Sequence, residues 1–309
     1  MLVSRVISWW NSMCSGDSEL VSGGKLFSRM VYLWMLFLFL FLSPLLHDVI
    51  GPKGLTYRTA YTPGILNNLV YILSYKPVLY KSIWAFNAAG IILCFFNLGN
   101  GKRAFSRKFW VLNTAINVLP KVIVWITGII LFSSTYFLFN AGVYLATNWL
   151  FWLIFYTPNP DSDWRIALNN WAVLAARIQF LIVYVYSAVY KWIEPDWING
   201  DSIHFLSLLK QFTPEWLSHV YQSAPWFTTF LTYLMLAYLT LFPVLIWWKK
   251  AKNILLTIGI GFHLYSMFIM KLYDFGLIMI IGYILFLSKG QVEWLHSKLG
   301  LFSFKKVRK

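Results

Sequence analysis

Four polar residues recur every seven positions along one apolar stretch of this 309-residue chain. They are Asn170, Arg177, Tyr184 and Lys191. Because a straight helix drifts only about 20° per heptad, all four would lie on nearly one face. Arg or Lys at the centre of a membrane helix costs about 2.5–3.5 kcal/mol on insertion scales. We therefore expect this face to point into a helix bundle or a wet cavity.

Lys191 ends this series and is the first candidate for catalysis. A lysine in apolar surroundings can act as a base or a nucleophile. The chain then continues as WIEPDW, an acidic exit rich in tryptophan. The substrate-binding candidates in this region are Arg177, Tyr184, Glu194, Asp196 and Trp197. The alternative for Arg177 and Lys191 is that their side chains extend toward the headgroups at the inner and the outer membrane surface, respectively.

His263 is the second catalytic candidate, because it lies in the middle of the apolar stretch IGIGFHLYSMFIMKLY. A histidine at that depth in a membrane needs a partner. Lys271 follows eight residues later, so a continuous helix would place it on roughly the same face as His263, and we include it among the substrate-binding candidates. The alternative is that His263 makes a structural hydrogen bond between helices.

No metal site is predicted. His47, His204 and His219 do not have the spacing of metal ligands, and Cys14 and Cys94 do not form a CxxC pair or a disulfide framework. The sequence has no HExxH motif, no phosphate loop and no convincing serine nucleophile motif. The cofactor therefore stays unknown at this stage.

The composition indicates that lipid is the solvent of this chain. Hydrophobic residues make up 59% of it and charged residues 12%, whereas soluble domains have about 45–50% and about 25%. The net charge of +15 would suggest nucleic acid in a soluble protein, but no recognition motif accompanies it. The expected partner is therefore the lipid bilayer, and nucleic acid is not an expected partner.

We predict an all-α, polytopic bundle of about eight membrane-spanning helices, since a span needs about 20 mainly apolar residues. The region Phe109–Tyr156 is too long for one span and about right for two, with a break near Asn140–Gly142. If it formed a single helix, the orientation of everything after it would invert. The other six expected spans are Phe27–His47, Ser82–Leu98, Leu168–Lys191, Trp226–Trp248, Ile254–Leu272 and Phe275–Leu287.

The positive-inside rule gives the expected orientation, with both termini in the cytoplasm. The loops Asn100–Lys108 and Lys249–Asn253 are basic and would face inward, and the acidic connection Trp192–Gln222 would face outward. The expected organisation is a cytoplasmic segment at residues 1–26, a transmembrane domain at residues 27–288 and a basic cytoplasmic tail at residues 289–309.

The segment YVYSAVYKWIEPDWINGDSIHFL resembles the signature region of the HTTM (horizontally transferred transmembrane) superfamily, which includes the vitamin K-dependent gamma-carboxylase. That pattern is a helix ending in a small residue, then a lysine, a tryptophan and a glycine; here these are Ala188, Lys191, Trp197 and Gly200. The stretches NPDSDWRIALNNW and FHLYSMFIMKLYDFGLIMIIGYILFL are similar to flanking family segments. The resemblance covers about Arg29–Leu287.

One departure limits what the resemblance implies. The carboxylase has two adjacent lysines at the helix exit, and the second is regarded as its base. Aligned from Trp197, the first lysine is Lys191 and the second position holds Trp192. Gamma-glutamyl carboxylation is therefore not expected. In size the chain is similar to short bacterial members, such as the sporulation-delay toxin maturation protein, which implies a multi-pass protein of a bacterial inner membrane.

Three function classes follow. The first is a maturation or modification factor for a secreted peptide or a lipid-soluble substrate, working at the outer face around Lys191. The second is a non-catalytic scaffold that binds partner membrane proteins. The third, a small-molecule transporter, has less support because the sequence shows no inverted repeat.

Overall fold

The computed structural model describes residues 19–45, 76–97, 110–133, 141–158 and 162–299, and also residues 11, 48 and 160. Every regular element in these ranges is helical. The elements are α2 (Glu19–Leu42), η1 (Ser43–Leu45), α5 (Pro77–Asn97), α6 (Trp110–Ser133), α7 (Ala141–Ile154), α8 (Asp163–Ile193), α9 (Pro195–Ile198), α10 (Ser202–Leu208), α11 (Glu215–Ser223), α12 (Pro225–Leu245), α13 (Lys249–Phe268), α14 (Tyr273–Tyr283), η5 (Ile284–Phe286) and α15 (Lys289–Leu299).

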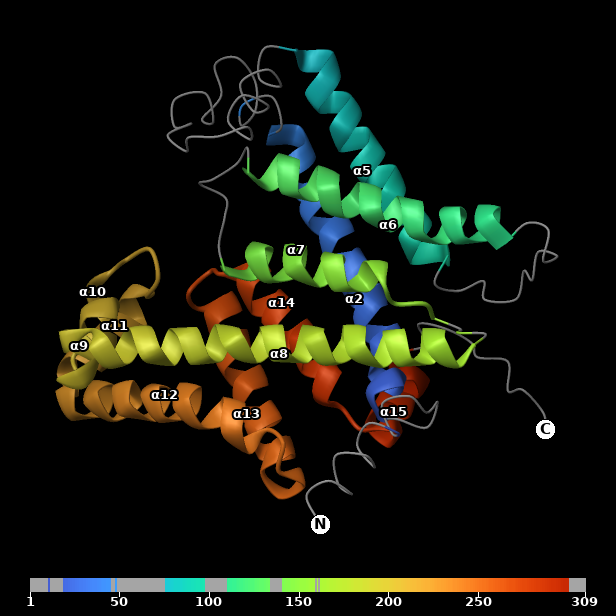
Figure 1. Cartoon of the computed structure of the whole chain (residues 1–309). Coiled ribbons are helices and arrows are strands. Elements are labelled where there is room, and N and C mark those ends of the chain that lie inside the picture. The colour runs from blue at the N-terminus through green and yellow to red at the C-terminus, as the bar shows by residue number, and fades with distance from the viewer. Residues whose placement is uncertain are drawn as a thin grey trace.

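The long helix α8 is the element around which the others pack (Figure 1). α12 lies antiparallel along one side of it and α7 along the other. α13 pairs with α14, and α14 also contacts α7 and α2. α5 and α6 form a pair that joins the bundle through α7 and α2. The short helices α9, α10 and α11, here called the cap, gather at the end of the α8–α12 pair.

The prediction of an all-helical membrane protein is confirmed. Four helical stretches are long and apolar enough to cross a membrane: Gly23–Leu45, Pro77–Phe96, Asp163–Ile193 and Pro225–Leu245. The shorter apolar helices are Asn117–Leu131, Ala141–Ile154 and Tyr273–Phe286. A helix therefore lies in each expected segment, while the number of eight spans and the orientation of the termini stay predictions.

The region between residues 109 and 156 forms two helices, as the sequence indicates. α6 ends at Ser133 and α7 begins at Ala141, close to the expected break. Residues 100–108, which were expected to form a basic loop, lie outside the described ranges, as do Cys14, His47 and residues 300–309.

The heptad series on α8 does face the bundle. Asn170 and Tyr184 are buried, and Arg177 and Lys191 are half-buried. The neighbouring helix α14 approaches closely because Gly282 has no side chain: a Cβ there would lie 2.3 Å from the Phe180 ring. α8 is a single 31-residue helix, so one rigid element positions all four residues.

The expected connection after α8 is folded as the cap. Gly200 closes the turn between α9 and α10 with φ of 86°, a left-handed conformation that favours glycine. A Cβ at Gly200 would also lie 2.7 Å from Cγ2 of Thr229 on α12. The Tyr233 hydroxyl donates to the Ile198 carbonyl at 2.8 Å. The cap is thus attached to the beginning of α12 and held over the end of the bundle.

Candidate functional site

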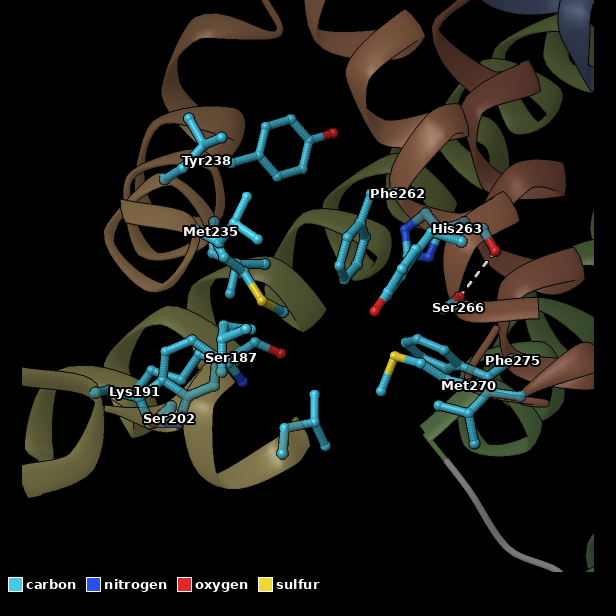
Figure 2. A pocket seen from close by; sticks show the side chains of 18 of the residues that line it. Ser187, Lys191, Ser202, Met235, Tyr238, Phe262, His263, Ser266, Met270 and Phe275 are labelled. Carbon is cyan, nitrogen blue, oxygen red and sulfur yellow. Dashed lines mark hydrogen bonds between the residues drawn. The ribbon is translucent and has the colours of Figure 1, made fainter. Parts of the chain in front are cut away.

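A cavity of about 810 Å³ lies beneath the cap, between α8, α12, α13 and the start of α14. Most of its lining is apolar, with polar groups from α8, the cap and α13. Figure 2 shows His263, Ser266 and Phe275 on one wall, with Ser187, Lys191 and Met235 on the opposite side. A pocket of this size with few polar groups is typical of a ligand-binding site.

Lys191 lies in the last turn of α8 and lines this cavity. Its Nζ atom is 4.6 Å from the centroid of the Trp197 ring, within the range of a cation–π interaction. Among the described residues it forms no ion pair with a carboxylate. Its ammonium can therefore bind a carboxylate or an oxyanion of a ligand, and its deprotonated form can act as a base or a nucleophile.

His263 and three tyrosines form a hydrogen-bonded chain at the wall of the cavity, where Tyr184, Tyr238 and His263 belong to the lining. The Tyr184 hydroxyl is 3.2 Å from Nε2 of His263 and 2.6 Å from the Tyr283 hydroxyl. The Tyr283 hydroxyl is 3.3 Å from that of Tyr238, which donates to the Leu255 carbonyl at 3.1 Å. This chain joins α8, α12, α13 and α14.

Gly259 on α13 makes room for these hydroxyls. A Cβ at Gly259 would lie 2.0 Å from the Tyr283 hydroxyl and 2.3 Å from the Tyr238 hydroxyl. At Gly261 no atom of the described residues, apart from the backbone of α13 itself and the two chain neighbours, lies within 4 Å of the corresponding position. The two glycines thus differ: one gives space to the tyrosine chain and the other faces outward from the packed part of the bundle.

Five of the predicted residues meet at the cavity. Sequence reasoning did not select Tyr238 and Tyr283, and no spacing rule links them to His263, since they come from different helices. The five predicted residues in the cavity lining are Tyr184, Lys191, Asp196, Trp197 and His263.

Arg177 and Glu194 are outside the lining. Nε of Arg177 donates to the Leu285 carbonyl at 2.6 Å, and its guanidinium carbon is 5.5 Å from the centroid of the Phe286 ring. Glu194 lies between α8 and α9, where its carbonyl accepts from the Trp197 amide at 3.1 Å. Both residues therefore support the elements that carry the site.

The expectation that Lys271 shares a helical face with His263 is wrong. α13 ends at Phe268, and Lys271 lies in the turn before α14, exposed and with φ of 60°. The Leu272 amide donates to the Ser266 carbonyl at 3.0 Å, which closes this turn. No glycine or proline marks the end of α13 in the sequence, so the run of apolar residues predicted a longer helix than the structure has.

Trp192, the residue after Lys191, does not line the cavity. Its indole Nε1 donates to the Thr240 hydroxyl at 3.0 Å, and its side chain is 52% exposed. Within the described ranges, no cluster of three or more histidine, cysteine or acidic residues could hold a metal ion.

Comparison with protein families gives one finding for this region. The HTTM domain family matches residues 129–294, which is more than half of the chain. The match includes α7 to α14 and so every residue that lines the cavity. It begins well after Arg29, where the resemblance in the sequence was expected to begin, and extends past Leu287 into α15. Comparison with curated proteins and with solved structures gives no match.

Proposed function

The chain is a membrane protein that belongs to the HTTM domain family, and from this premise we propose that it is a maturation or modification factor. Its substrate is a secreted peptide or a lipid-soluble molecule that enters the cavity beneath the cap. Lys191 and His263 act on the substrate, and Tyr184, Asp196 and Trp197 help to bind it.

The observation that carries this proposal is the position of Lys191. Its ammonium is half-buried at the wall of an apolar cavity and has an aromatic ring rather than a carboxylate beside it among the described residues. Ionisable groups in membrane helices are costly and usually mark a functional site. A cavity with an apolar lining suits an apolar side chain or a lipid chain, while Lys191 suits a polar group attached to it.

The distribution of charge supports an outer location for this cavity. Lys249, Lys250 and Lys252 lie at the opposite end of α12 from the cap. The positive-inside rule puts such a cluster on the cytoplasmic side. The cap then faces outward, as a factor acting on secreted molecules requires.

The experiment uses the organism that encodes this chain. Its gene is deleted, and the secreted peptides and membrane lipids of the deletion strain are compared with those of the parent by mass spectrometry. The expected result is a product that disappears on deletion and returns with the wild-type gene. The Lys191→Ala gene should fail to restore it while the protein accumulates to the wild-type level in the membrane.

Lys210→Ala is the matched control, because Lys210 is a lysine of the cap, between α10 and α11, that is exposed and outside the cavity lining. It should restore the product fully. If folded Lys191→Ala restores the product as well as the Lys210→Ala control does, the proposal is wrong.

A second candidate is a non-catalytic scaffold subunit. The observation that favours it is the exposure of Trp216 on the cap and Trp226 at the start of α12, 61% and 74% respectively. Exposed aromatic residues are frequent at protein interfaces, although they also lie at membrane surfaces. Purification in mild detergent distinguishes the candidates: a stable stoichiometric complex that is insensitive to changes at Lys191 and His263 favours the scaffold.

A further inference from the structure

We propose that the tyrosine chain holds His263 as the neutral imidazole with its proton on Nε2, so that Nδ1 accepts a hydrogen bond from a hydroxyl or N–H group of the cavity's occupant. This inference rests on the proposed function in one respect, namely that the cavity binds a substrate. It adds the chemical class of that substrate: an apolar molecule that carries a hydrogen-bond donor.

The direction of the chain follows from counting hydrogens. Four hydrogen bonds link Leu255, Tyr238, Tyr283, Tyr184 and His263. A carbonyl can only accept, and each tyrosine hydroxyl has one hydrogen to donate. The three hydroxyl hydrogens and one imidazole hydrogen satisfy all four bonds in a single arrangement.

That arrangement begins at the carbonyl. Tyr238 donates to Leu255, so the bond between Tyr238 and Tyr283 must have Tyr283 as its donor. Tyr283 then accepts from Tyr184, whose own hydrogen is used in that bond. Tyr184 can therefore only accept from His263, and the proton lies on Nε2.

The opposite arrangement, with Tyr184 donating to His263, loses one of the four bonds. The Tyr238 hydroxyl could then donate its single hydrogen either to the Leu255 carbonyl or to the Tyr283 hydroxyl, but not to both. The opposite arrangement also puts the imidazole hydrogen on Nδ1, where no acceptor lies among the described residues, and a buried donor without a partner is costly. The arrangement that satisfies every bond is therefore the stable one.

Nδ1 is the atom left over. It is buried and has no hydrogen-bond partner within the part of the chain that the structure describes. His263 as a whole is only 1% exposed and is one of the residues lining the cavity. A buried acceptor without a partner is rare in proteins, and because His263 belongs to the cavity lining, we assign the partner of Nδ1 to the occupant of the cavity.

A doubly protonated His263 is disfavoured by its surroundings. The ring lies against Phe262, Phe275 and Tyr283, with centroid distances of 5.0, 5.7 and 5.8 Å. The carboxylate in the cavity lining belongs to Asp196, which is exposed and comes from the cap. An imidazolium without a nearby carboxylate would be an uncompensated buried charge.

The first test is ¹⁵N NMR of the full chain in lipid nanodiscs with labelled histidine. The His263 signals are identified by their absence in His263→Gln. The ¹⁵N chemical shifts are expected to show that Nε2 is protonated and Nδ1 is not. A proton on Nδ1 in the wild-type protein would overturn the proposal.

Two tyrosine variants on α12 sharpen this test. Tyr238→Phe removes the donor to Leu255, and the shortened chain then satisfies its bonds equally well in either direction. A second population with the proton on Nδ1 should appear. Tyr233→Phe is the control, since its hydroxyl bonds to the cap instead, and it should leave the His263 signals unchanged. A Tyr238→Phe spectrum identical to wild type would contradict the hydrogen count.

The second test measures ligand preference with 2-naphthol and its methyl ether, which differ in the hydroxyl hydrogen. Binding to the nanodisc-embedded chain is followed by tryptophan fluorescence. The naphthol should bind roughly threefold to tenfold more tightly than the ether, the effect of one hydrogen bond. His263→Phe should reduce the preference to that seen with empty nanodiscs. If wild type and His263→Phe show the same preference, Nδ1 is not the acceptor.

These outcomes are separate from those of the genetic experiment. If the Lys191→Ala gene restores the lost product, the proposed function is wrong, but the measured tautomer of His263 is unaffected. If wild type and His263→Phe prefer the naphthol over its ether equally, the inference about Nδ1 is wrong, but the proposed role of Lys191 is unaffected.

Discussion

Arg177 and Lys191 lie two heptads apart on the same face of α8, but they have different neighbours. Arg177 lies opposite η5, where it donates to the Leu285 carbonyl and covers the Phe286 ring. Lys191 lies beyond the packed part of the bundle, over Trp197 and at the wall of the cavity. The two cations look alike in the sequence, and the element opposite each one makes the difference.

This comparison indicates how a polar helix face can serve two purposes. Where a neighbouring helix end offers a carbonyl, a cation ties the helices together. Where a cavity lies beneath the cap, a cation on the same face is available for a ligand. The tyrosine chain, which includes Tyr184, separates these two regions of α8. We expect the region of α8 around Arg177 to be structural and the region around Lys191 to be functional.

The largest effect on stability is expected at the boundary between the regions, from Gly259→Ala. The added methyl group would overlap the Tyr283 and Tyr238 hydroxyls, and overpacking of this kind costs about 1–3 kcal/mol. Unfolding in detergent, followed by heating or by denaturant, measures the loss. Gly261→Ala on the same helix meets no side chain of the described residues, so it should be neutral or stabilising. Equal losses for the two variants would contradict the packing described for the tyrosine chain.

Arg177→Met and Lys191→Met compare the two cations directly. Arg177→Met leaves the Leu285 carbonyl without its donor, and we expect a loss of about 2 kcal/mol in the free energy of unfolding. Lys191→Met should change stability by less than about 0.5–1 kcal/mol, the size of an exposed cation–π contact. The same unfolding measurement applies. A larger loss for Lys191→Met would make Lys191 the structural residue of the pair.

Gly200→Ala tests the attachment of the cap. The left-handed conformation costs a residue with a Cβ about 1–2 kcal/mol, and the methyl group would press on Thr229. Hydrogen exchange should increase in α9 and α10 more than in α14. Gly290→Ala serves as the control and should leave exchange in the cap unchanged, since none of the described residues outside its own helix has an atom within 4 Å of a Cβ there. Unchanged protection of the cap in Gly200→Ala would show that the turn tolerates a side chain.

The smallest effect is expected from Trp192→Phe. It removes the hydrogen bond to Thr240, and such bonds between membrane helices average about 0.6 kcal/mol. Because Trp192 lies outside the cavity lining, the product lost on gene deletion should return in full. A loss of product as severe as that of Lys191→Ala would assign a role in the site to the position where the carboxylase has its second lysine.

The sequence was sufficient for the helical class and for the face of α8, because apolar length and seven-residue spacing depend on local geometry. It also selected Lys191 and His263, whose residue types are costly in lipid, and Trp197, which follows Lys191 in the acidic, tryptophan-rich exit of the helix. It could not identify Tyr238 and Tyr283, since tyrosine is common in membrane helices and only the crossing of four helices brings their hydroxyls together. It misplaced Lys271, because a left-handed lysine ends the α13–α14 turn without a local signal.

The central claim is that the cavity beneath the cap is a binding site facing Lys191 and His263. The most direct measurement is an electron cryomicroscopy structure of the full chain extracted together with its native lipids. We expect density for a non-protein molecule in the cavity, with a polar group near Nζ of Lys191 and a hydrogen-bond donor near Nδ1 of His263. A cavity closed by side chains, with Lys191 paired to Asp196, would contradict it.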